Sequence, residues 1–176
     1  MSNELGATEK DLIENRKNKI AELEKLGVNP YPSETDRNIT AAEIIDQQDE
    51  LIKSEKNITA AGRIMARRGH GKLSFVDLVD ESGKIQAVLR ADFLSEKDLE
   101  VVALLDVGDF LEVSGKVFIT KAGELSIEAH SAKILTKSIR PLPEQWFGLK
   151  DVETRYRERY VDLIVNSEVK EKFYIR

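Results

Sequence analysis

Between residues 57 and 136 the chain consists of short segments in which apolar and polar residues alternate, a pattern typical of strands. In the segment Leu73–Asp80, Val76 and Leu78 fall on one face, while Phe75 and Asp77 fall on the other. The pattern predicts five strands, at Asn57–Met65, Leu73–Asp80, Lys84–Leu89, Phe110–Ile119 and Glu124–Leu135. In the third of these, the residues expected to face inward are Ile85, Ala87 and Leu89, and those expected outward are Lys84, Gln86 and Val88.

The order of these elements predicts a specific fold. A helical pattern over Glu96–Leu105 separates the third strand from the fourth. Three strands, one helix and two strands is the order of a five-stranded OB-fold barrel, which binds oligonucleotides across the face of its second and third strands. Gly62 interrupts the first strand and predicts a bulge or a sharp bend there. We therefore expect a mainly β fold with flanking helices.

Prolines divide the chain into three parts. All four lie in two clusters, Pro30–Pro32 and Pro141–Pro143, and proline disfavours helix in the residue before it. We expect a helical extension at residues 1–55, an OB-fold domain at 56–137, and a linker leading into a further domain at 138–176. Helical spacing predicts helices over Thr8–Leu26, ended by Gly27, and over Ala41–Leu51. Both a packing role and a direct RNA contact remain open for these helices.

Charge and composition limit the function classes. The net charge of −5 argues against a general nucleic-acid coat protein, and the absence of cysteine excludes disulfides and thiolate chemistry. No apolar run is long enough for a signal peptide or a membrane span, so we expect a cytoplasmic protein. One local basic patch stands out against the acidic average, formed by Arg63, Arg67, Arg68 and Lys72. Such a patch favours a specific, oriented contact.

Four residues are candidates for binding a nucleic acid. Phe75 is expected on the outward face, where its ring could stack on a base, unless a bulge returns it to the core. Gln86 offers an amide donor and acceptor that match the edge of uracil. Arg68 can donate to a base carbonyl or a phosphate, and Glu124, at the tip of the last hairpin, can accept from a base N–H. Singly, each polar residue is weak support, since most surface polar residues are merely solvated.

No catalytic, cofactor-binding or metal-binding residue is predicted. The segment Gly69–Lys72 resembles the end of a phosphate-binding P-loop, but Ala66 and Leu73 replace residues that such a loop requires. His70 and His130 lack metal-ligand spacing and a nucleophilic partner.

Several segments together resemble one family. They are Gly62–Arg68, Gly71–Val76, Gly83–Gln86, Val107–Asp109, Thr120–Ile127, Leu135–Pro143 and, as the longest ordered match, Gly148–Ile164. The chain is similar to the N-terminal anticodon-binding domain of bacterial-type class II lysyl-tRNA synthetases, from about Asp11 to Arg176. The Tyr- and Arg-rich part of the last segment reads by itself as an amphipathic surface helix.

The resemblance implies a function for the four candidates. In that family the residues matching Arg68, Phe75, Gln86 and Glu124 contact the uridines of the lysine anticodon. Arg67, Phe118 and Lys121 are candidate neighbours.

The family's activity is ATP-dependent ligation of lysine to tRNA in a parent enzyme that is usually a homodimer. The motifs that bind ATP, Mg²⁺ and lysine would follow Arg176, so we expect this chain alone to bind the tRNA(Lys) anticodon loop without catalysis and without a cofactor. An aspartyl- or asparaginyl-tRNA synthetase domain, a general single-strand-binding OB protein and a protein-interaction barrel remain alternatives.

Overall fold

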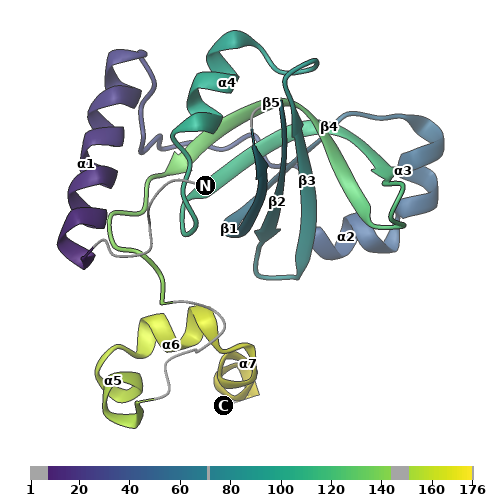
Figure 1. Cartoon of the computed structure of the whole chain (residues 1–176). Coiled ribbons are helices and arrows are strands. Elements are labelled where there is room, and N and C mark those ends of the chain that lie inside the picture. Colours follow the sequence, from purple (N-terminus) through teal and green to yellow (C-terminus); the bar gives the residue numbers. More distant parts are fainter. Residues whose placement is uncertain (1–7, 71, 144–150, 176) are drawn as a thin grey trace. The chain divides into compact units, whose positions relative to one another are not determined.

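The computed structural model describes residues 8–70, 72–143 and 151–175. The chain forms two compact units, Met1–Arg140 and Pro141–Arg176. The first contains a β-barrel with helices around it (Figure 1). Within the described ranges no helix is long and apolar enough to cross a membrane.

Five strands close into a barrel in the order β1-β2-β3-β5-β4 (Figure 1). The strands are β1 Ile58–His70, β2 Leu73–Val79, β3 Lys84–Arg90, β4 Phe110–Ile119 and β5 Leu125–Thr136. All neighbouring pairs are antiparallel except β3 and β5, which run parallel, and β1 closes the ring against β4. Helix α4, Glu96–Ala103, lies between the third and fourth strands in the chain, so the predicted fold class is confirmed.

The barrel interior is filled by the residues that alternation placed inward. Val76 and Leu78 from β2 join Ile85, Ala87 and Leu89 from β3 in one hydrophobic core. Phe75 is not part of that core, so the alternative of a bulge that returns its ring to the interior is wrong.

The first strand differs from its prediction in length and in the place of its irregularity. β1 continues to His70, and its register against β2 shifts at Met65, not at Gly62. A side chain at position 62 would place its Cβ 3.0 Å from the Val79 carbonyl oxygen. Gly62 therefore allows two backbones to approach closely, while Met65 is the extra residue that bends the strand.

The part of the chain before the first strand forms helices that lie around the barrel (Figure 1). Helix α1 spans Glu9–Lys25 and is followed by Gly27 at φ +67°, as predicted. The helix predicted over Ala41–Leu51 is two helices, α2 Ala41–Asp46 and α3 Gln48–Ser54. The capping box of Thr40 with Glu43 is present at the start of α2. The break falls at Gln47, where exposed side chains give the helix no packing against the barrel.

A buried ion cluster joins α1, the segment after α4 and the end of β5. The Lys137 ammonium is fully buried and donates to Asp106 at 2.5 Å, Asp109 at 2.7 Å and the Leu104 carbonyl at 2.8 Å. From α1, Lys19 reaches the same Asp106 carboxylate at 2.6 Å. Burial by itself raises the pKa of Asp106, but hydrogen bonds from Lys137 and Lys19 outweigh it and hold this pKa below its ordinary value. Its stabilising contribution is therefore present at neutral pH and is lost as the pH falls through the lowered pKa.

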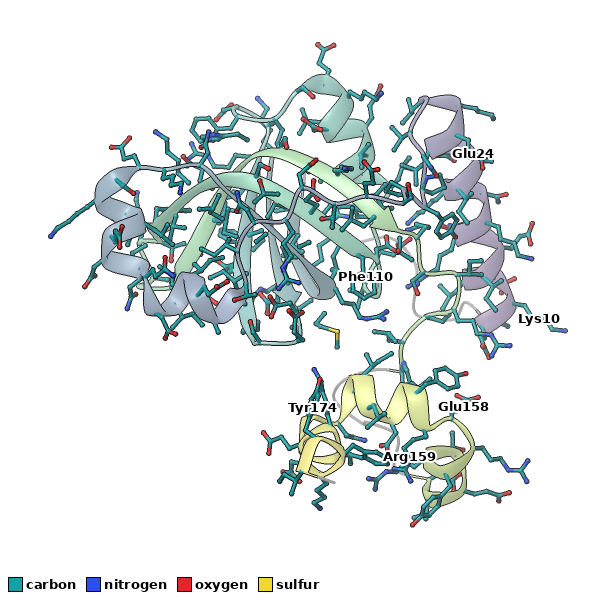
Figure 2. The ribbon with its side chains drawn as sticks, turned by 180° about the vertical axis from the view of Figure 1, so that it is seen from behind. Lys10, Glu24, Phe110, Glu158, Arg159 and Tyr174 are labelled. Carbon is teal, nitrogen blue, oxygen red and sulfur yellow. The ribbon has the colours of Figure 1, made fainter. Side chains whose placement is uncertain are left out.

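The second unit contains three short helices, α5 Val152–Arg157, α6 Arg159–Val165 and α7 Ser167–Ile175. The Tyr- and Arg-rich stretch is thus not one helix, because Glu158 takes a non-helical conformation between α5 and α6. The buried Asp162 carboxylate accepts from Arg155 and Asn166 and pairs with Arg159, which Figure 2 labels on α6. Residues 144–150, which include the start of the segment Gly148–Ile164, lie outside the described ranges.

We expect Gly115→Ala to destabilise the barrel strongly. An added Cβ would lie 1.9 Å from the Glu128 carbonyl oxygen on β5, so backbone would have to move. The expected loss in free energy of unfolding is about 2 kcal/mol or more, measured by urea denaturation.

Gly83→Ala is the matched control, since its Cβ would meet only the Ala41 side chain at 3.8 Å. That variant should change stability by less than about 1 kcal/mol. Equal stability of the two variants would contradict the close approach of β4 and β5.

Candidate nucleic-acid interface

The outer face of the barrel presents two rows of side chains that cross all five strands. Strand register defines each row, because paired residues project on the same side of a sheet. The first row is Ala66, Asp77, Gln86, Ser126 and Phe118. The second row is Arg68, Phe75, Val88, Glu128 and Lys116. We call these ten residues the reading face. Three of the four predicted site residues therefore lie on one surface.

Phe75 lies on the reading face with its ring half-buried. It is paired with Arg68 on one side and Val88 on the other, and Val88 is 3% exposed although it is outside the barrel core. The ring thus has a neighbour on each adjoining strand while part of it stays open to solvent. A supported, partly open ring suits stacking on a flat ligand.

Gln86 also lies on this face, but its side chain is covered. Only 4% of the residue is exposed. Its Nε2 donates to Glu124 Oε2 at 2.8 Å, and its Oε1 accepts from the Ser126 hydroxyl at 3.0 Å. Alternation placed the residue on the correct face but could not show these partners. One amide N–H and one oxygen lone pair remain for a further ligand.

Glu124 reaches the reading face from the β4–β5 hairpin. The residue is exposed, and its backbone is fixed by a turn in which its N–H donates to Thr120 Oγ1 at 3.0 Å. Gly123 supplies the positive φ of +83° in that turn. The carboxylate is therefore at the end of a long side chain on a fixed backbone. One hydrogen bond joins it to Gln86.

Arg68 is an exposed cation on the reading face. Its side chain is 58% exposed and donates to Asp77 Oδ1 at 2.9 Å, while Lys84 lies 3.5 Å from the other oxygen of the same carboxylate. Sequence reasoning placed Asp77 beside Phe75 but gave it no role. The structure shows that Asp77 positions Arg68, and the shared outward face was the available signal.

The predicted basic patch is divided by the fold, which corrects the expectation of one contact surface. Arg63 donates to the Gly108 carbonyl at 3.0 Å and lies 4.3 Å from the ring centre of Phe110, a residue labelled in Figure 2. Arg67 is paired with the core residue Val76 and donates to the Leu105 carbonyl at 2.7 Å. Burial lowers the pKa of both guanidinium groups. Arg67 thus points to the other side of β1 from Arg68.

The other two candidate neighbours lie on β4 and in the turn that follows it. Phe118 is half-buried in the first row, paired with Ser126. Lys121 is exposed in the β4–β5 turn. Neither was singled out by strand pattern, because their positions depend on how β5 pairs with β3 and β4.

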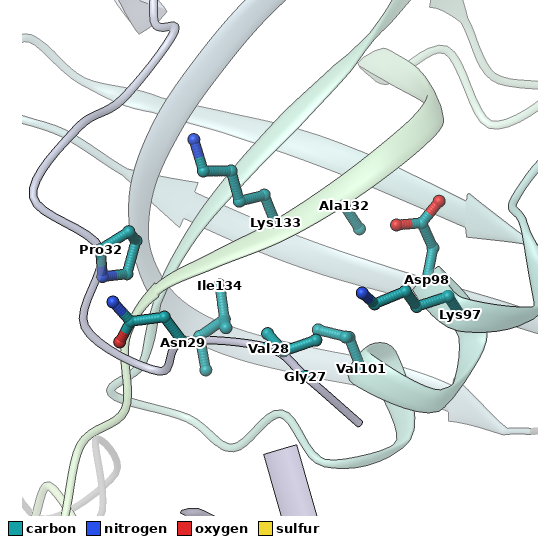
Figure 3. A pocket seen from close by; sticks show the side chains of 10 residues that line it. All are labelled: Gly27, Val28, Asn29, Pro32, Lys97, Asp98, Val101, Ala132, Lys133 and Ile134. Atoms are coloured by element: carbon teal, nitrogen blue, oxygen red, sulfur yellow. The ribbon is translucent and has the colours of Figure 1, made fainter. Parts of the chain in front are cut away.

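A separate cavity of about 290 Å³ lies between α4, β5 and the segment that follows α1 (Figure 3). Its lining includes Val28, Val101 and Ile134, with Lys133 at its rim. Lys133 is already close to two carboxylates, those of Asp36 and Glu112. None of the four predicted site residues lines this cavity.

Comparison with known proteins agrees with the strand order of the barrel. Residues 58–135 match the family described as OB-fold nucleic acid binding domain. The barrel is an OB-fold domain. The match covers all five strands except Thr136, the last residue of β5.

The chain is also similar to proteins named lysine–tRNA ligase. It is 49% identical over 166 residues to that of Carboxydothermus hydrogenoformans, covering 94% of this chain and 34% of the relative. It is 47% identical to that of Pelotomaculum thermopropionicum, with 94% and 32% covered. For Halalkalibacterium halodurans the identity is 42% over 181 residues, with 100% and 36% covered. The chain spans about a third of the length of these curated relatives, and the resemblance drawn from its motifs is confirmed.

We expect Ser126→Ala to destabilise the OB-fold domain. The substitution removes the donor to the buried Gln86 Oε1, and an unpaired buried polar group costs about 1–3 kcal/mol. Ser131→Ala, an exposed serine on the same strand, should stay within about 0.5 kcal/mol of the parent. Urea denaturation of both variants measures the difference. Equal stability would show that Gln86 does not depend on this hydroxyl.

Proposed function

We propose that this chain is the part of a lysine–tRNA ligase that recognises the anticodon loop of tRNA(Lys). The observation that carries the proposal is the reading face itself. It combines a half-buried aromatic ring, a fixed amide and an exposed guanidinium, contributed by Phe75, Gln86 and Arg68. Strands two and three, which carry two of them, are where OB-fold domains bind oligonucleotides. The identity of 41–49% to lysine–tRNA ligases points to tRNA as the oligonucleotide.

The geometry suggests a role for each residue. A base turned out of the anticodon loop stacks on Phe75, since single-stranded loops offer unstacked bases. Gln86 lies diagonally across from Phe75, two residues from Val88 on the neighbouring strand, and its remaining donor and acceptor meet the edge of that base. Arg68, held by Asp77, donates to a phosphate or a base carbonyl. Glu124, at the hairpin, accepts from a base N–H.

The face is suited to discrimination more than to general affinity. The net charge is −5, and the guanidinium of Arg68 is already paired with a carboxylate. Non-specific binding to phosphates depends on unpaired cations, so it should be weak. A wrong base, in contrast, leaves buried polar groups without partners, which lowers its affinity.

The ligation chemistry belongs, in this proposal, to the rest of the parent enzyme. Ligation of lysine would require ATP and Mg²⁺, yet within the described ranges no group of three His, Cys, Asp or Glu residues could hold a metal ion. We assign no residue of this chain to that chemistry. Residues 138–176 would then lead from the OB-fold domain at 56–137 into the catalytic part, residues 1–55 would be its helical extension, and the parent enzyme would be a cytoplasmic homodimer.

We expect Phe75→Ala to weaken binding of a lysine anticodon stem-loop by about 1–3 kcal/mol, roughly 5- to 150-fold in Kd, because a base stacked on an aromatic ring contributes that much. Phe75→Trp keeps a flat ring and should bind within a few fold of the parent. Fluorescence anisotropy at fixed salt measures both. An unchanged Kd for Phe75→Ala, with its thermal unfolding unchanged, would contradict the stacking role.

Base preference separates the proposal from its alternatives. Replacing the third anticodon uracil by cytosine should weaken binding by about tenfold or more, because a buried polar group left unpaired costs about 1–3 kcal/mol. Tighter binding of the cytosine stem-loop would favour an aspartyl enzyme, and tighter binding with guanine at the first position an asparaginyl one. Equal binding of all stem-loops with a steep salt dependence would indicate a general single-strand binder. If no stem-loop binds, the remaining alternative is a barrel that interacts with another protein.

A further inference from the structure

A second aromatic group lies where β3 ends. After Arg90 the chain turns, with the N–H groups of Phe93 and Leu94 both donating to the Arg90 carbonyl, at 3.1 and 3.2 Å. The Arg90 guanidinium lies 4.6 Å from the ring centre of Phe93. The Phe93 ring also lies 5.7 Å from the His130 ring, tilted by 59°. We call Arg90, Phe93 and His130 the second platform.

The second platform continues the surface that carries Phe75. Val88 is paired with Phe75, and Arg90 is the next outward residue along β3. Two residues of a strand span about 7 Å. Arg90 also bonds Glu128, the reading-face residue paired with Val88. The strand residues beside the two aromatic groups, Val88 and Arg90, are thus about 7 Å apart along one face, which is comparable to one nucleotide step.

Phe93 is exposed although its neighbour is buried. Phe93 is 41% exposed, whereas Leu94, which follows the same turn, is 7% exposed and belongs to the barrel core. Leu94 therefore anchors the turn by burial. The large ring left open beside it contributes little to the core and lies close to the Arg90 guanidinium and the His130 ring.

The charges around the second platform suit a base better than a phosphate. Arg90 lies 3.3 Å from Glu128 and 3.8 Å from Asp92, so its positive charge is balanced by two carboxylates. A phosphate would meet those acids. A neutral base needs only the ring and the guanidinium plane, both of which stack on bases.

We propose that the second platform stacks one nucleotide immediately outside the anticodon triplet, so that the domain holds four bases. The proposal rests on the proposed function, because it takes the triplet to lie on Phe75 and Gln86. It assigns to Phe93 a role in affinity that is independent of which amino acid the parent enzyme uses.

Two variants at one position test the proposal. Phe93→Leu keeps an apolar side chain but removes the ring, and Phe93→Trp keeps a ring. The leucine variant should weaken binding of the lysine anticodon stem-loop by about fivefold or more, which is the lower end of base stacking. The tryptophan variant should bind within about twofold of the parent. Because no phosphate contact is lost, the dependence of Kd on salt should keep its slope in both.

A fluorescent base gives a second readout, whose first measurement is made on the parent chain. 2-Aminopurine is placed one position outside the triplet, on the 5′ side in one stem-loop and on the 3′ side in another. Stacking quenches its fluorescence, so one of the two probes should be quenched by the parent chain and should recover with Phe93→Leu. A probe inside the triplet should stay quenched with that variant.

The outcomes distinguish this proposal from the one on which it rests. If Phe75→Ala weakens binding while Phe93→Leu does not, and neither outside probe is quenched, the second platform takes no base and the anticodon proposal stands. If no stem-loop binds the parent chain, or if Phe75→Ala binds as well as the parent, the proposed function itself fails and the second platform falls with it. A changed salt slope for Phe93→Leu would mean that the site holds a phosphate.

Discussion

The reading face depends on one constraint, the parallel pairing of β3 with β5 that helps to close the barrel. Gln86 and Glu124 are 38 residues apart, and only this pairing brings the last hairpin over the amide of the third strand. The same closure needs β4 and β5 to cross tightly, which Gly115 permits by having no side chain where the Glu128 carbonyl lies. Because an OB-fold barrel closes through contacts that are distant in the chain, its binding surface forms only when the whole domain has folded.

Alternation predicted much of the fold from local information. It located the five strands and the core set around Val76 and Leu78, and it put Phe75 and Gln86 on the outward face. Alternation failed where the pairing register of two strands decides which face a residue occupies. Met65 is an extra residue in β1, and beyond it the inward and outward positions exchange, so Arg63 and Arg68 are outward while Arg67 is not. A basic run that looks continuous in sequence is therefore divided between two sides of a strand.

Burial of polar groups was also beyond prediction from sequence. A lysine just past a strand reads as a solvated residue, yet Lys137 is fully buried because Asp106 and Asp109 converge on it from a loop about 30 residues earlier. Removing one partner of such a cluster leaves an uncompensated charge, which is strongly destabilising. Through Lys19 the cluster also holds α1 against the barrel. The amino-terminal helix is thus part of the same compact unit as the OB-fold domain.

The two hydrogen-bond partners of Gln86 also fix the orientation of its amide group. A carboxylate can only accept and is bonded to the nitrogen, while the Ser126 hydroxyl is bonded to the oxygen. Rotating the amide by half a turn would oppose oxygen to oxygen at Glu124. The order of donor and acceptor along the amide is therefore fixed before any ligand arrives. At N3 and the group on C4, uracil and cytosine present donor and acceptor in opposite order, so under the proposed function an amide that cannot turn over would distinguish one pyrimidine from the other.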